Sequence, residues 1–140
     1  MMDWSIDAGS SLPPSRQLVE KVLDALARAS LEAGDQLPSV RKMAGLALVN
    51  HNTVARAYRD LEQLGAVAGQ NGRGVFVTPE GPAIAKDQRK GSTLEAFEQA
   101  AQEALRAGHD PQNLLDILQG LHGQVPRLSK QDPKGPRKSA

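Results

Sequence analysis

The sequence predicts a mainly α-helical protein with one small β-hairpin. Three segments in the first half carry apolar residues at helical spacing, two short β-branched segments with a glycine-rich connection follow, and two more amphipathic segments lie near the C-terminus. The chain has 140 residues, which leaves room for one domain and a small appendage. With 39% hydrophobic and 24% charged residues, it has the balance of a globular protein with a modest core.

Three helices are predicted before residue 66. The first begins near Pro14, since proline suits a first helical turn, and ends near Ser30. The second follows the N-cap residue Ser39, and the third covers 51–64, between the N-cap residue Asn50 and the glycine that stops it. The apolar stripe of the third helix consists of Val54, Ala57, Tyr58, Leu61 and Leu64.

A β-hairpin is predicted after the third helix. Its strands lie at 66–68 and 75–78, and the connection 69–74 is flexible, polar and basic. The alternating segment 2–7 is expected to add a short leading strand. Three helices followed by a hairpin, with a short leading strand, make a winged helix-turn-helix domain, which we place at residues 1–79.

The rest of the chain is predicted to form a linker at 80–91 and a C-terminal helical hairpin at 92–124. Ser92 or Thr93 is expected to cap the first of these two helices. The helical hairpin has too much apolar surface to stand alone in water, so we expect it to pair across a dimer. Residues 125–140 hold five basic residues and almost no hydrophobes, which predicts a disordered basic tail.

Composition and spacing exclude several kinds of chemistry. The chain has no cysteine, which excludes disulfides, thiolate metal sites and cysteine nucleophiles. His51, His109 and His122 lack metal-ligand spacing, and no phosphate loop, dinucleotide fingerprint or Ser/His/Asp order is visible. We therefore expect no enzyme, no cofactor and no metal. Without a membrane-length apolar stretch or an export signal, we expect a cytoplasmic protein with no membrane partner.

Positive charge gathers locally, although the formal net charge is only +1. The window 39–59 contains no acid, and its basic residues are Arg41, Lys42, Arg56 and Arg59. On the third helix, Asn52, Arg56 and Arg59 share a stripe away from the apolar one. Asn52 can pair bidentately with adenine, and either arginine can reach guanine or phosphate. A polar stripe of this kind is also typical of a solvated face on a packing helix.

The tip of the hairpin supplies a second basic element. Arg73 lies between Gly72 and Gly74, and such an arginine can enter a narrow minor groove while the glycine backbone approaches phosphate. His51, at the start of the third helix, is either a surface residue or a contact at the entrance to the major groove. Together with the acid-free window, the tip favours DNA binding. A winged-helix module that binds a protein and has no operator stays open as the alternative.

Several spaced blocks resemble the GntR family of bacterial transcription regulators. In order, the blocks are Pro14–Val19, Leu37–Met43, Val49–Glu62, Leu64–Gly65 and Gly72–Val77. The helical hairpin at 92–122 resembles the short C-terminal part of the YtrA-type subfamily. The resemblance implies a homodimeric repressor on a palindromic double-stranded DNA operator. The DNA contacts that it implies are Arg41, Asn50, His51, Asn52, Thr53, Gly72 and Arg73.

Two positions depart from the pattern of the resembled family. Residue 51 is often Arg or Pro in relatives and is histidine here, and Ala55 stands where many relatives carry a contacting arginine. Most of the family also carries a large effector domain, whereas about 45 residues follow the predicted linker, too few for a typical enclosed metabolite pocket. The sequence leaves open whether a small-molecule effector binds between subunits.

Overall fold

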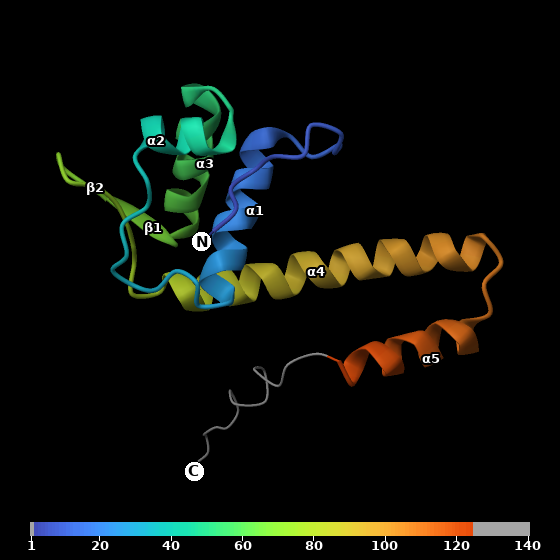
Figure 1. The fold of residues 1–140 in the computed structure, drawn as a ribbon. Coiled ribbons are helices and arrows are strands. Elements are labelled where there is room, and N and C mark those ends of the chain that lie inside the picture. The colour runs from blue at the N-terminus through green and yellow to red at the C-terminus, as the bar shows by residue number, and fades with distance from the viewer. Residues whose placement is uncertain (1, 125–140) are drawn as a thin grey trace, which may run out of the picture. The chain divides into compact units, whose positions relative to one another are not determined.

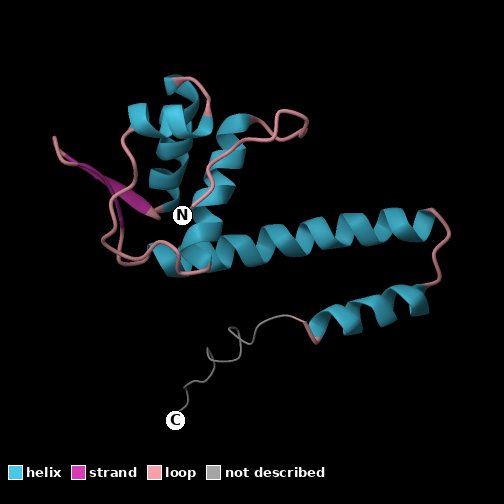
Figure 2. Cartoon of the chain, viewed as in Figure 1, coloured by secondary structure: helices cyan, strands magenta, loops and turns pink. Residues whose placement is uncertain are grey.

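The computed structural model describes residues 2–124 and places them in five helices and one two-stranded antiparallel sheet (Figures 1 and 2). The mainly helical class with one small hairpin is confirmed. The chain forms two compact units, one ending at Leu94 and one beginning at Glu95. The predicted basic tail, 125–140, lies outside the described residues.

Three helices form the core of the first unit: α1 (Pro14–Ala27), α2 (Val40–Ala47) and α3 (His51–Leu64). Helix α3 packs against both of the others. Its predicted apolar stripe is buried, apart from Leu64 at the C-terminal end, which is partly exposed. The fully buried side chains of this core include Val54 and Leu61 of α3 together with Leu18, Val22, Leu26 and Met43 of the other two helices.

Helix α1 ends at Ala27, earlier than the predicted Ser30. Ala29 takes a left-handed φ of 64°, which turns the chain out of the helix. The N–H groups of Ser30 and Leu31 then donate to the carbonyl of Ala25, at 2.8 and 3.1 Å. These bonds satisfy a carbonyl that the end of the helix leaves unpaired, in the manner of a helix C-cap that usually contains glycine.

Helices α2 and α3 begin at the predicted N-caps. The hydroxyl of Ser39 accepts a hydrogen bond from the N–H of Lys42 at 3.1 Å, and Asn50 Oδ1 accepts one from the N–H of Thr53 at 2.9 Å. Gly65 then ends α3 with a φ of 86°. Residues next to each helix end therefore determine where α3 starts and stops.

The hairpin consists of β1 (Val67–Gln70) and β2 (Gly74–Val77). The segment 34–37 lies along the other edge of β2, where the N–H of Leu37 donates to the carbonyl of Val75 at 2.8 Å. This segment leads directly into the N-cap of α2. Backbone hydrogen bonds through the segment 34–37 therefore connect the hairpin to the start of α2.

The segment 2–7 forms no strand, so that prediction is wrong. Its alternation instead buries Trp4 in the core. At its end the side chain of Gln17 takes the place of a strand partner: the N–H of Asp7 donates to Gln17 Oε1 at 2.9 Å, and Gln17 Nε2 donates to the carbonyl of Asp7 at 3.0 Å. The edge of β2 is occupied by 34–37, and a side chain satisfies the N-terminal backbone instead.

The segment 80–91 is not the predicted linker but the first part of α4 (Gly81–Arg106). Gly81 is buried, and a Cβ there would lie 2.6 Å from the carbonyl oxygen of Ala66, so a larger residue would not fit. Ala85, one turn later, is fully buried. Tertiary packing therefore stabilises a helix over residues with the composition of a linker.

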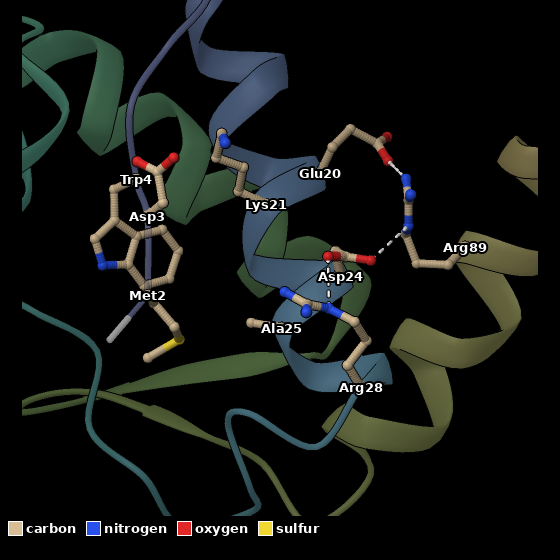
Figure 3. Close-up of a pocket in the computed structure, with 9 residues that line it drawn as sticks. All are labelled: Met2, Asp3, Trp4, Glu20, Lys21, Asp24, Ala25, Arg28 and Arg89. Carbon is tan, nitrogen blue, oxygen red and sulfur yellow. Dashed lines mark hydrogen bonds and ion pairs between the residues drawn. The ribbon is translucent and has the colours of Figure 1, made fainter. Parts of the chain in front are cut away.

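The predicted cap at Ser92 or Thr93 is also wrong, because α4 already runs through both residues. The hydroxyl of Thr93 donates back to the carbonyl of Arg89 at 2.6 Å. Arg89 in turn forms ion pairs with Glu20 and Asp24 of α1 (Figure 3). These pairs join the first turns of α4 to α1 within the first unit.

The second unit contains the end of α4 and α5 (Pro111–His122). The carboxylate of Asp110 caps α5 by accepting a hydrogen bond from the N–H of Gln112 at 3.4 Å. In the described part of this unit every side chain is exposed or only half-buried. An apolar hollow of about 430 Å³ lies in it, lined by Phe97, Ala100, Ala101, Ala104, Leu105, Pro111, Leu114, Leu115, Ile117, Leu118 and Leu121.

Candidate nucleic-acid interface

Helix α3 has one face in the core and one in solvent. The buried side chains are Val54, Ala57, Tyr58 and Leu61, and the exposed ones include His51, Asn52, Arg56 and Arg59. Asn52 and Arg56 lie one turn apart on the exposed face, where helix geometry makes them neighbours. The division into a core stripe and a polar stripe agrees with the predicted register of the helix.

The first turn of α3 combines a cap with free donors. Asn50 Oδ1 accepts from both the N–H and the hydroxyl of Thr53, at 2.9 and 3.2 Å, which leaves the amide N–H₂ of Asn50 to donate elsewhere. Helix geometry gives the N–H groups of His51 and Asn52 no partner inside the helix. This end of α3 therefore suits an anion such as a phosphate.

Tyr58 holds α3 against the start of α2. Its hydroxyl donates to the carbonyl of Pro38 at 2.6 Å. Burial raises the pKa of Tyr58, so the hydroxyl stays protonated and continues to donate. Pro38 precedes the N-cap Ser39, and the exposed Arg41 lies in the first turn that this cap begins. The contact thus sets where Arg41 lies relative to α3.

The tip of the hairpin presents Gly72 and Arg73 to solvent. The N–H of Arg73 donates to the carbonyl of Gln70 at 2.8 Å, which closes the turn. A second contact comes from outside the hairpin, where Gln36 Nε2 donates to the carbonyl of Arg73 at 2.8 Å. The backbone that carries Arg73 is therefore held from two sides.

Sequence reasoning missed Gln36 and the contact of Tyr58 with Pro38. The predicted core stripe correctly includes Tyr58, but the partner of its hydroxyl lies 20 positions away. Gln36 and Arg73 are separated by 37 positions. No local pattern signals either contact, because each depends on which segments pack side by side.

The basic side chains of the candidate interface are not neutralised by neighbours. In the part of the chain that the structure describes, the ion pairs are formed by Arg16, Arg28 and Arg89, all with carboxylates of α1. The exposed cations outside these pairs on α2, α3 and the hairpin are Arg41, Lys42, Arg56, Arg59 and Arg73. Such a set is an electrostatic footprint suited to the phosphates of a nucleic acid.

A polar hollow of about 300 Å³ lies in the first unit, between the N-terminal segment, α1 and α4 (Figure 3). Hydrogen bonds from Ser5 lower the pKa of Asp3, the carboxyl beside Trp4.

Within residues 2–124, no three His, Asp or Glu side chains converge on a point that could hold a metal ion. No helix in the same range is long and apolar enough to cross a membrane.

Comparison with known proteins identifies the family. Residues 14–77 match the family described as bacterial regulatory proteins, gntR family. The chain is also 38% identical over 90 residues to the uncharacterized HTH-type transcriptional regulator YhcF of Bacillus subtilis, a match that covers 63% of this chain and 74% of that protein. The chain belongs to the GntR family. The family predicted from the spaced sequence blocks is thereby confirmed.

The similarity of this GntR-family chain extends beyond the winged domain. It is 29% identical over 127 residues to the HTH-type transcriptional repressor YtrA of Bacillus subtilis, covering 91% of this chain and 98% of that protein. It also resembles the crystal structure of a transcriptional regulator from Oenococcus oeni, with a TM-score of 0.66 and 30% identity over 83% of this chain and 96% of that one. These matches include the C-terminal helices, so the resemblance to the YtrA type is confirmed. The chain is a transcription regulator of a DNA-binding family.

Proposed function

We propose that this GntR-family regulator is a homodimeric repressor that binds a palindromic double-stranded DNA operator. One observation carries the proposal: the solvent face of α3 presents Asn52, Arg56 and Arg59, and neither arginine is paired within the described residues. The opposite face of α3 is buried, so the core fixes the helix on which these side chains form an exposed row. A helix with such a row fits the major groove of B-form DNA.

Asn52 and Arg56 are the residues that read bases in this proposal. Asn52 lies in the first turn, the part of such helices that approaches base edges most closely, and its amide can donate and accept together, as adenine requires. Arg56 lies one turn further on and can reach guanine. Both side chains are exposed, so they are available without disturbing the core.

The remaining site residues anchor the protein on the DNA backbone. Donors at the start of α3 and α2, together with the hairpin tip, reach phosphates, and the exposed Arg73 can also enter the minor groove. The backbone at Gly72 can approach phosphate closely because the residue has no side chain. The proposed anchors are Arg41, Asn50, His51, Thr53, Arg59, Gly72 and Arg73.

A second copy of the chain is the proposed partner of the second unit. Leu118 is 45% exposed and Phe97 51% exposed, and both line the apolar hollow. Two-fold symmetry lets the same patch of each copy cover the other. Each copy then places its α3 in a major groove, with half-sites about 10 base pairs apart or a multiple of that.

Repression follows from occupying promoter DNA, and the similarity to YtrA, which is named as a transcriptional repressor, supports this sign of regulation. The proposed place of action is the cytoplasm, where a chromosomal operator lies. Neither an enzymatic activity nor a cofactor is part of the proposal. A small-molecule effector of this regulator would bind between subunits.

Selection of duplexes from a random pool by the full-length protein, followed by sequencing, tests the proposal. The expected result is an inverted repeat. The matched control is the double variant Asn52→Ala/Arg56→Ala, which keeps the core and should enrich no sequence. Enrichment of single half-sites would contradict the palindrome. A protein-interaction module without an operator would enrich nothing and would show no salt-dependent binding to random duplexes.

A further inference from the structure

We infer that Gln36 is a positioning residue that holds the hairpin tip, and with it Arg73, in place for DNA. The inference rests on the proposed function, in which Arg73 contacts the DNA. Gln36 Nε2 donates to the carbonyl of Arg73 at 2.8 Å. The acceptor is the backbone of the tip itself, at the residue just before β2 begins.

The backbone of Gln36 is fixed by the sheet. Gln36 lies opposite Phe76 of β2, and the neighbouring N–H of Leu37 donates to the carbonyl of Val75 at 2.8 Å. The side chain therefore starts from a defined position beside β2 and runs towards the tip. The same segment continues into Ser39 and α2, where Arg41 lies.

Gly74 leaves the room that this side chain needs. A Cβ at Gly74 would lie 2.4 Å from Gln36 Nε2, and the φ of Gly74 is +119°, a conformation that other residues rarely adopt. Glycine at this position thus permits both the path of the chain and the approach of the amide. The hydrogen bond from Gln36 to Arg73 therefore depends on the absence of a side chain at residue 74.

This contact differs from the hydrogen bond that closes the turn. The bond from the N–H of Arg73 to the carbonyl of Gln70 stays within the hairpin, so the whole tip can still move as a unit. The bond from Gln36 connects the tip to the segment 34–37, which leads into α2. It therefore sets the distance between two proposed DNA anchors, Arg73 and Arg41. A neutral amide does so without placing a negative charge near phosphate.

A double-mutant cycle tests the inference. Gln36→Met keeps the length of the side chain and removes its donor, and Arg73→Ala removes the proposed DNA contact. Fluorescence anisotropy with a random-sequence duplex over a salt series measures binding by wild type, both single variants and the double variant. We expect a weakening of about fivefold for Gln36→Met and about tenfold for Arg73→Ala, with the double variant no weaker than Arg73→Ala. Gln88→Met, a change at an exposed position of α4, is the matched control and should bind like wild type.

A second readout separates positioning from general stability. NMR relaxation of the Arg73 backbone amide without DNA should show greater mobility in Gln36→Met, while the thermal midpoint stays near that of wild type. Equal binding by Gln36→Met and wild type, additive effects in the cycle, or unchanged mobility of Arg73 would each overturn the inference and leave the proposed function standing. A wild type that binds no duplex would instead refute the proposed function itself.

Discussion

Leucines at helical spacing occur in both units, but within the described residues the buried ones all lie in the first unit. Leu61 of α3 is 0% exposed, whereas Leu118 of α5 is 45% exposed. Three helices and a hairpin enclose a core within one chain, and two helices cannot cover their own apolar faces. Periodicity therefore identifies an amphipathic helix, but it does not tell whether the same chain or another one covers the apolar face.

The largest effect is expected when a leucine is replaced by alanine in the first unit and the result is compared with the same change in the second unit. Leu61→Ala leaves a cavity in the core and should lower the free energy of unfolding by about 2–5 kcal/mol. Leu118→Ala should lower it by less, and its effect should depend on protein concentration, because in the proposed dimer Leu118 also contacts the second copy. Urea denaturation at two protein concentrations measures both. Equal, concentration-independent losses would remove the contrast between the units.

Putting a charge on the apolar face of α5 tests the proposed dimer directly. Leu118→Glu should yield a monomer and weaken operator binding roughly a hundredfold, because each protomer then binds a single half-site on its own. Light scattering measures the mass. Leu46→Glu is the matched control: Leu46 is 48% exposed in the first unit, so the dimer should persist. A wild-type protein that is monomeric at micromolar concentration would contradict the proposal.

The exposed face of α3 should affect binding without affecting the fold. Asn52→Ala should cost about 1–3 kcal/mol of binding on the selected operator and little on scrambled duplex. The free energy of unfolding should change by no more than about 0.5 kcal/mol, because the side chain is exposed. Titrations on paired duplexes measure the effect, with Gln63→Ala, near the other end of α3, as the control. Equal losses on both duplexes would make Asn52 a phosphate anchor.

The smallest expected effect concerns the hairpin tip and appears mainly in the salt dependence. Arg73→Ala should weaken binding to all duplexes and reduce the slope of log affinity against log salt by about one. Arg16→Ala is the control, because Arg16 is paired with Glu20 on α1 and lies outside the proposed interface. An unchanged slope for Arg73→Ala would remove the hairpin from the interface.

The sequence by itself determined the elements whose signals are local. Ser39 and Asn50 cap α2 and α3 by hydrogen bonds to a residue three positions away, and Gly65 ends α3 through its own backbone conformation. The register of α3 follows from its apolar stripe, so the exposure of Asn52 and Arg56 could be predicted. Their roles on DNA remain predictions that the experiments above address.

Only the tertiary structure decided where α4 begins, which segment lies beside β2, and what holds the tip at Arg73. Residues 80–91 have the composition of a linker, yet burial of Gly81 and Ala85 makes them helical. The partner of β2 is 34–37 and not the N-terminal segment. The physical reason is the same in each case: a cap is a hydrogen bond within one turn, whereas packing joins distant residues and can outweigh local propensities of about 1 kcal/mol per residue.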